Sequence, residues 1–336
     1  MMENKRWKQA SILFLIVILV SVIAGCGRLK QGRIEKKEDT IRKQKVTLIA
    51  KSTESAFWKS VFAGAGAAST EYNMELKCEG PENEEDYVTQ NRMIEEAVAE
   101  GTDVIIFSAI DYEENAEAVD QAAKKGVKIV VIDSDVKSKE VGCRIGTDNY
   151  EAGCLAGKAA LETTEEQINI GIVNFDVTTE NGQSREKGFR DTVGKDSRTV
   201  IVDTINVNST IDSAKQEAKK LLAEFPQINV LVTFNEWTSL GVGYAVKELG
   251  LADSVRVVAF DSNVVSVDML ETGEVDALIV QNPYAMGYLG VENAYHLLGG
   301  HEVEKEEINT STHLVTKENM YSEESQRMLF SFDEIR

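Results

Sequence analysis

Short apolar runs alternate with amphipathic segments along most of this chain, and that alternation limits the folds open to it. The runs are five or six residues long and rich in Val and Ile, which is typical of strands buried on both faces. We expect strands at residues 46–50, 74–78, 103–107, 127–132, 168–173, 199–203, 229–234, 255–260 and 275–280. Amphipathic helices are expected at residues 87–100, 115–125, 213–224 and 239–249. The repeated strand–helix–strand order predicts an α/β fold of doubly wound parallel sheets.

Length and charge narrow the possibilities further. From residue 46 to the end the chain has 291 residues, more than a single core usually holds, so two lobes are expected. This part has 25 basic and 52 acidic side chains, a net charge of −27, which argues against a nucleic-acid partner because phosphates would be repelled. Such charge favours solubility, and steering of a cationic ligand is the alternative explanation.

The first 26 residues have the pattern of an export signal. A basic stretch with Lys5, Arg6 and Lys8 precedes nine apolar residues at 12–20, a run too short to span a bilayer. The sequence Ile-Ala-Gly-Cys, ending at Cys26, resembles a bacterial lipid-attachment site. We therefore expect a signal peptide over residues 1–25 and a lipidated Cys26, with a cleaved secretory signal and an incidental cysteine as the alternative.

The residues that follow Cys26 are strongly basic. Residues 27–45 have eight basic and three acidic side chains and few apolar ones, which predicts a solvated tether that can rest against anionic head groups. Residues 26–45 are thus predicted to be a lipid anchor with a charged tether. The rest of the protein is expected to be exported and held at the outer face of the cell membrane.

Cysteine and histidine give no sign of a metal or a disulfide framework. Three cysteines remain after the anchor, Cys78, Cys143 and Cys154, and no CxxC pair occurs. The three histidines are not spaced as ligands. We expect the cysteines to be small buried residues, and neither a metal nor a cofactor is predicted.

Polar and aromatic residues recur just after the predicted strands. Parallel α/β sheets bind ligands at the carboxyl ends of their strands, so these residues are candidates for a site. They are Ser55, Phe57, Trp58, Asp133, Asn235, Trp237, Asp261 and Gln281. Carboxylates and amides satisfy ligand hydroxyls, and aromatic rings cover the apolar face of a sugar.

Each candidate also has a purely structural explanation. Asp133, Asn235 and Asp261 could cap helices or form turns, and Gln281 could bond to loop backbone. The aromatic residues could pack on the sheets. The placement of all of them at strand ends is what favours a common site.

Eight motifs in this order resemble the type I periplasmic-binding-protein superfamily, in particular the ribose/galactose-type solute-binding proteins of ABC importers. They are STESAFW, VIIFSAID, VKIVVID, IGTDNYEAGCLAGKAAL, REKGF, VTFNEWTSLG, VVAFDSN and ALIVQNPYAMGYLGVENA, and the resemblance covers about residues 46–318. The resemblance implies two α/β lobes that are joined by three crossovers and close on one small ligand.

The resemblance also implies roles for individual residues. Asp133, Asn235, Asp261 and Gln281 match residues that hydrogen-bond sugar hydroxyls, Ser55 matches a polar contact, and Phe57 and Trp58 match aromatics that sandwich the sugar ring. The chain departs from the ribose-binding pattern at three places. Ser134 and Gln183 stand where arginines are usual, with Arg185 two residues on, and an aromatic is replaced near Ser209. Gln183, Arg185 and Trp237 complete the candidate ligand-binding set.

By the same resemblance the chain is divided discontinuously. Lobe one takes residues 46–147 and 282–311, lobe two takes residues 148–281 and 312–318, and hinges are expected at 147–148, 281–282 and near 311. Residues 319–336 form a C-terminal extension without an assigned role.

The function implied is a monomeric, lipid-anchored receptor that presents a small sugar-like ligand or polyol to the membrane permease of an ABC importer. A sensor kinase is the alternative membrane partner. A sugar-responsive repressor of the same fold would have a helix-turn-helix in place of the export signal. A glycoside-acting enzyme using Asp133 and Asp261 is a further alternative, although the sequence has no GxSxG elbow and no phosphate-binding glycine loop.

Overall fold

The computed structural model describes residues 42–175, 177–300 and 307–330. Cys26, the signal peptide and the tether up to residue 41 lie outside the described residues, so their expected roles stay predictions. By its contacts the chain divides into residues 1–42 and a compact unit of residues 43–336, which holds all the elements below. No helix in the described segments is both long and apolar enough to span a bilayer.

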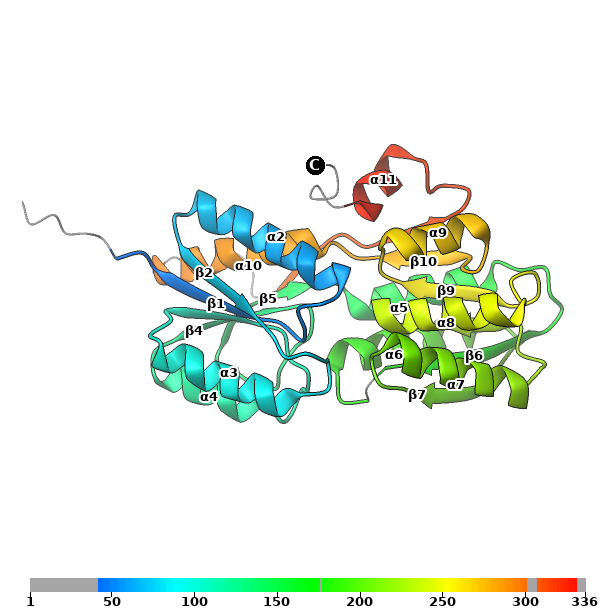
Figure 1. Ribbon diagram of the computed structural model, residues 1–336, viewed down its shortest axis with the longest axis horizontal. Coiled ribbons are helices and arrows are strands. Elements are labelled where there is room, and N and C mark those ends of the chain that lie inside the picture. Colours follow the sequence, from blue (N-terminus) through cyan, green and yellow to red (C-terminus); the bar gives the residue numbers. More distant parts are fainter. Residues whose placement is uncertain (1–41, 176, 301–306, 331–336) are drawn as a thin grey trace, which may run out of the picture. The chain divides into compact units, whose positions relative to one another are not determined.

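Two six-stranded sheets form the centre of this unit, and helices cover both faces of each (Figure 1). Lobe one is the part built on the sheet with strand order β11-β5-β4-β3-β1-β2, and lobe two the part built on the sheet with order β12-β10-β9-β8-β6-β7. All neighbouring strands are parallel except β10 and β12. The predicted doubly wound α/β fold with two lobes is confirmed.

The strands of lobe one are β1 (Lys45–Ile49), β2 (Glu75–Glu79), β3 (Val104–Phe107), β4 (Lys128–Ile132), β5 (Val141–Gly146) and β11 (Glu307–Asn309). Those of lobe two are β6 (Ile168–Asn174), β7 (Thr199–Asn206), β8 (Val230–Val232), β9 (Arg256–Phe260), β10 (Ala277–Val280) and β12 (His313–Thr316). The helices are α2 (Ala56–Glu71), α3 (Tyr87–Ala99), α4 (Ala116–Lys124), α5 (Asn149–Leu161), α6 (Glu180–Val193), α7 (Ile211–Glu224), α8 (Glu236–Leu249), α9 (Val264–Thr272), α10 (Pro283–Leu298) and α11 (Glu323–Leu329).

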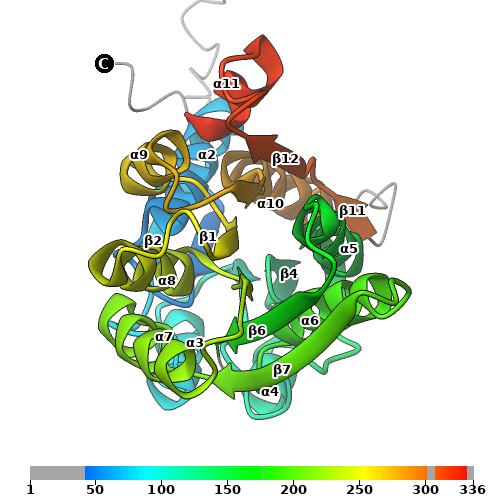
Figure 2. The ribbon, with the colours of Figure 1, turned by 90° about the vertical axis from the view of Figure 1, so that its right-hand side faces the viewer.

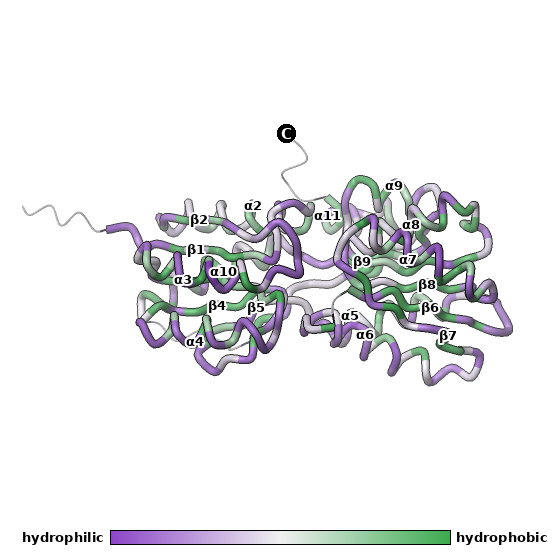
Figure 3. Tube along the Cα trace, turned by 60° about the horizontal axis from the view of Figure 1, so that its bottom comes forward, coloured by the Kyte–Doolittle hydropathy of each residue, from purple (hydrophilic) through white to green (hydrophobic). Residues whose placement is uncertain are grey.

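Each sheet is buried on both faces because most residues of its central strands are apolar. In lobe one, α2 and α10 cover one face and α3 and α4 the other. In lobe two, α5 and α6 pack on one face and α7, α8 and α9 on the other (Figure 2). Figure 3 shows the central strands as hydrophobic segments, with hydrophilic stretches outside them. The polar side chains that follow the central strands therefore lie at the carboxyl ends of the sheets.

The chain passes between the sheets three times. The passages lie between β5 and α5, between β10 and α10, and between β11 and β12. Two hydrogen bonds connect these three passages to one another. Thr147 Oγ1 donates to Gln281 Oε1 at 2.8 Å, and Asn282 Nδ2 donates to Ser311 Oγ at 3.2 Å.

All nine predicted strands are present, but three strands were not predicted. Strand β5 was missed because its sequence, VGCRIG, is half-buried and interrupted by glycine. Strands β11 and β12 are only three and four residues long. The expectation that all three cysteines are buried is wrong for Cys78, which is exposed on the edge strand β2, whereas Cys143 and Cys154 are buried.

A close contact between α5 and α6 fixes the helix that bears Arg185. A Cβ added at Gly153 would lie 2.0 Å from the Arg185 carbonyl oxygen, and one at Gly188 would lie 2.0 Å from the Tyr150 carbonyl oxygen. The two helices approach this closely because both positions lack a side chain.

The C-terminal residues, for which the sequence indicated no role, pack on lobe two. Met320 and Leu329 are buried in its core with residues of α7, α8 and α9. Ser262 Oγ donates to the Leu329 carbonyl at 3.2 Å. Helix α11 is thus part of lobe two.

Candidate functional site

Both lobes contribute to a small cavity at the carboxyl ends of their strands. Its walls hold nine of the ten candidate ligand-binding residues, together with five others. The lining residues are Lys51, Ser55, Phe57, Trp58, Glu84, Asp133, Phe175, Asn181, Arg185, Asn235, Glu236, Trp237, Asp261 and Gln281. Its volume is about 30 Å³, which is room for only a few water molecules. The lobes are therefore closed on each other at this site.

Gln183 is the one candidate that the structure does not bring to the cavity. It is exposed on α6, whereas Asn181 and Arg185 of the same helix are buried and line the cavity. Residues four apart lie on one face of a helix, and a residue two positions along points away from that face. The structure thus places Asn181 in the cavity wall and the candidate Gln183 outside it, and the spacing of Asn181 from Arg185 was the signal that could have found it.

Asp133 receives hydrogen bonds from both lobes. Ser108 Oγ donates to its Oδ2 at 3.0 Å, and Asn181 Nδ2 donates across the cleft to its Oδ1 at 3.1 Å. Lys51 Nζ and Arg185 Nη2 each lie 3.8 Å from one of its carboxylate oxygens. Asp133 is thus a meeting point of the two lobes and of both cations in the cavity wall.

Arg185 is buried and holds several parts of the site in place. Its Nε donates to Asn149 Oδ1 at 2.9 Å, its Nη1 to the Phe234 carbonyl at 2.7 Å, and its Nη2 to Gln281 Oε1 at 2.7 Å. The guanidinium also lies over the Phe260 ring, 5.1 Å from its centroid. This fork of fixed donors orients the ends of β8 and β10 relative to α6.

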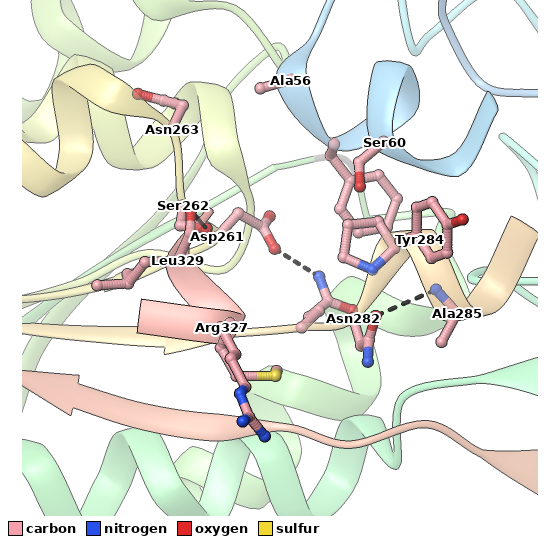
Figure 4. Close-up of a pocket in the computed structure, with 14 residues that line it drawn as sticks. Ala56, Ser60, Asp261, Ser262, Asn263, Asn282, Tyr284, Ala285, Arg327 and Leu329 are labelled. Atoms are coloured by element: carbon pink, nitrogen blue, oxygen red, sulfur yellow. Dashed lines mark hydrogen bonds between the residues drawn. The ribbon is translucent and has the colours of Figure 1, made fainter. Parts of the chain in front are cut away.

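Asp261 is the second strand-end carboxylate and accepts a hydrogen bond from Gln281. Gln281 Nε2 donates to Asp261 Oδ1 at 2.7 Å (Figure 4). Burial raises the pKa of Asp261 to about 7, although the Arg185 charge and the Gln281 bond favour the ionised form. Since Gln281 also accepts from Arg185 and Thr147, its amide links this carboxylate to the first passage between the lobes.

Glu84, which the sequence analysis missed, comes from the loop between β2 and α3. Its Oε1 accepts from Trp58 Nε1 at 2.9 Å, and its Oε2 accepts from Ser209 Oγ at 2.8 Å and from Asn235 Nδ2 at 3.4 Å. Ser209 was singled out as a position where the family has an aromatic. In this protein Ser209 of lobe two instead donates a hydrogen bond to the Glu84 carboxylate of lobe one.

Glu236 makes another contact between the lobes, and it too was missed. It is the first residue of α8, next to Asn235, whose side chain accepts from the Thr238 amide and caps that helix. Its carboxylate accepts from the backbone N–H groups of Ala56 and Phe57 at 3.2 and 3.0 Å. These groups lie in the first turn of α2 in lobe one, where a negative charge is favoured. Burial raises the pKa of Glu236, while the bonds from Phe57, Asn263 and Ala56 oppose this.

The adjacent aromatic residues Phe57 and Trp58 do not form parallel faces in the cavity wall. The Phe57 and Trp58 rings are 5.1 Å apart and inclined at 85°, so the pair does not sandwich a ring between them. Phe175 lies under Lys51, whose Nζ is 5.4 Å from the ring centroid. Trp237 also lines the cavity, in lobe two. The aromatic side chains of the cavity wall thus come from both lobes.

A second cavity of about 290 Å³ adjoins the first, with Phe57, Asp261 and Gln281 in the walls of both. Figure 4 shows Ser60 and Tyr284 on one side of it and Arg327 and Leu329 of α11 on another. The C-terminal helix therefore forms part of the wall that leads to the strand-end site. Within the described residues, no group of His, Cys, Asp and Glu is arranged to hold a metal ion.

Comparisons with known proteins agree with this architecture. A family model described as a periplasmic binding protein domain matches residues 46–302. The D-ribose/D-allose-binding protein of Pseudomonas aeruginosa is 28% identical over 83% of this chain and 90% of its own length.

Two solved structures are also similar. A carbohydrate transporter solute-binding protein from Agrobacterium radiobacter, in complex with D-arabinose, has a TM-score of 0.84 and 28% identity and covers 87% of this chain and 100% of its own. A chain of the XylFII–LytSN complex has a TM-score of 0.75 and 26% identity, with 82% of this chain and 98% of that chain covered. With its two lobes and three passages, this chain belongs to the periplasmic binding protein domain family and has its type I fold.

Proposed function

We propose that this protein captures a small polyhydroxylated ligand, a monosaccharide or related polyol, between its two lobes. The observation that supports it most directly is the meeting of Asp133, Asn235, Asp261 and Gln281 around one buried cavity. Carboxylates accept hydrogen bonds and amides both donate and accept, as a ligand rich in hydroxyls requires. A relative named for ribose and allose, and a similar structure solved in complex with D-arabinose, favour the same ligand class. Like its sugar-binding relatives, the protein acts by binding a ligand and is not an enzyme.

The cavity in the closed form is too small for a sugar, so capture requires the lobes to move. We propose that residues 147–148, 281–282 and 310–312 act as the hinges, since the chain passes between the sheets there. A ligand would replace direct contacts between the lobes, such as the bond from Asn181 to Asp133. Closure then follows from the ligand's preference for the closed form.

We further propose that lipidated Cys26 anchors the protein to the outer face of the cell membrane, where a monomer presents its ligand to the permease of an ABC importer. The family membership favours export, and the basic residues 27–45 favour contact with anionic lipid. A membrane sensor kinase is the second candidate partner. It is favoured by the similarity to a chain that forms a complex with another protein, the XylFII–LytSN complex.

A binding screen tests the ligand class. Full-length protein in detergent is titrated with pentoses, hexoses, polyols and nucleosides, and its unfolding is followed by tryptophan fluorescence. A ligand at a hundredfold excess over its Kd should stabilise the folded form by about 2.7 kcal/mol. Asp261→Ala should remain folded and lose that shift. If no sugar or polyol stabilises the folded parent protein, or if Asp261→Ala binds as tightly as the parent, the proposed site is wrong.

A further inference from the structure

The charged side chains in the wall of the strand-end cavity do not balance. Four carboxylates and two cations line it, and all six are at most 9% exposed. They are Lys51, Glu84, Asp133, Arg185, Glu236 and Asp261. With every group charged, the wall has a net charge of −2, and burial, which raises the pKa of Asp261 to about 7 and also raises the pKa of Glu236, opposes part of that charge at neutral pH. Charges of one sign in a site that excludes water act strongly on whatever binds there.

The two cations lie close to the same carboxylate. Lys51 Nζ and Arg185 Nη2 are each 3.8 Å from an oxygen of Asp133. Within the described segments, no Lys, Arg or His nitrogen lies within 4.0 Å of a carboxylate oxygen of Glu84 or Glu236. Asp261 in the same described segments has no such cation within 4.0 Å either, so the excess negative charge is spread over Asp261 and the side of the cavity formed by Glu84 and Glu236.

Neutral donors hold these two carboxylates without cancelling their charge. Glu84 accepts from the Trp58 indole, the Ser209 hydroxyl and the Asn235 amide. Glu236 accepts from two backbone N–H groups and from Asn263 Nδ2 at 2.9 Å. The start of α2 offsets part of the charge of Glu236, so Glu84 is the carboxylate whose charge a cation on the ligand would neutralise.

We infer that the ligand has a cationic amino group as well as hydroxyls, as in an amino sugar or an aminopolyol, and that Glu84 is the residue that selects it. This inference rests on the proposed function, because it specifies the ligand of the same cavity. An ammonium group donates three hydrogen bonds and pairs with a carboxylate, whereas a hydroxyl satisfies a carboxylate oxygen but leaves the wall charged. The net charge of −27 on residues 46–336 attracts the same class of ligand from solution.

The test compares sugars that have an amino group with counterparts that have a neutral hydroxyl or acetamido group in its place. Full-length protein in detergent is titrated calorimetrically at pH 7 with D-glucosamine, D-galactosamine and D-mannosamine, with the parent hexoses, and with the N-acetyl forms. The ring-nitrogen analogue 1-deoxynojirimycin is included to place the charge in the ring. At least one amine should bind about tenfold or more tightly than its neutral counterparts.

Two variants assign the effect to Glu84. Glu84→Gln keeps the shape and removes the charge, and it should weaken the binding of the amine about tenfold or more beyond its effect on the neutral sugar. Glu82→Gln, with the same charge change at an exposed position on the same loop, should change neither.

The outcomes separate this inference from the proposed function. If neutral sugars bind as tightly as their amines, or if Glu84→Gln weakens both equally, the cationic ligand is wrong and sugar capture stands. If neither neutral sugars nor amines bind the folded protein, both proposals fail.

Discussion

Asp133 and Asp261 occupy matching places in the two lobes, and both have a left-handed backbone. Each directly follows a central strand, β4 or β9, and their φ angles are 57° and 67°. Non-glycine residues rarely adopt this conformation, which costs about 1 kcal/mol or more and persists where the surroundings enforce it. Both side chains line the cavity between the lobes. The two lobes therefore use the same strained turn to present a carboxylate to the cleft.

The first prediction concerns the pH dependence of stability. Burial raises the pKa of Asp261 to about 7, so the folded state holds a proton that the unfolded chain releases near its ordinary value of 3.8. The resulting stabilisation is fully present below about pH 4 and is lost as the pH rises through about 7. Asp261→Asn removes this dependence. Relative to the parent, the variant should gain stability between pH 4 and pH 8, by at most about 4 kcal/mol.

Urea unfolding of both proteins across this pH range measures the difference directly. Asp253→Asn, which changes an exposed carboxyl in lobe two, is the matched control for the general loss of a charge. A constant difference between Asp261→Asn and the parent over the whole range would contradict the raised pKa.

The second prediction concerns the closed form of the protein without ligand. Glu236 of lobe two accepts from the backbone N–H groups of Ala56 and Phe57 in lobe one. Glu236→Ala leaves both groups unsatisfied in the closed form, at a cost of roughly 1–3 kcal/mol each, whereas water satisfies them in an open form. The radius of gyration from small-angle X-ray scattering should therefore increase. Glu224→Ala, exposed on α7 of the same lobe, should leave it unchanged.

The third prediction concerns the helix pair that positions Arg185. Gly188→Ala places a Cβ 2.0 Å from the Tyr150 carbonyl and forces α5 and α6 apart, which should lower stability by roughly 1–3 kcal/mol or more. In the matched control, Gly66→Ala, the added Cβ meets no atom within 4 Å on helix α2. That variant should be more stable by roughly 0.5–1 kcal/mol, because alanine favours a helix. Equal thermal midpoints for the two variants would show that the close approach of α5 and α6 does not contribute to stability.

The sequence predicted the parts of the site that follow directly from strand ends. Asp133, Asn235, Asp261 and Gln281 were found because parallel strands bring their carboxyl ends to one edge, whatever the details of the loops. The doubly wound fold followed from the same apolar runs. The pattern of apolar runs was enough to predict this fold because the central strands are buried on both faces.

The sequence could not predict site residues whose role depends on contacts between the two lobes. Glu84 lies in a loop of lobe one, and its partners Ser209 and Asn235 are more than a hundred residues away in lobe two. Glu236 has the pattern of an ordinary acidic first turn, and only the facing N-terminus of α2 gives it another role. Gln183 lies outside the cavity because a match by position ignored the helical period that places Asn181 and Arg185 on one face of α6.

The last prediction concerns the membrane anchor, which lies outside the described residues. If Cys26 is lipidated, metabolically supplied palmitate should label the parent, which should sediment with membranes, and Cys26→Ser should lose both the label and the membrane association. Cys78→Ser is the matched control, since Cys78 is an exposed thiol of the folded unit, and it should behave as the parent does. Two acyl chains on one cysteine give stable anchoring, whereas the basic residues 27–45 alone give an attraction that salt weakens. Membrane association of Cys26→Ser that survives high salt would therefore rule out lipidation as the anchor.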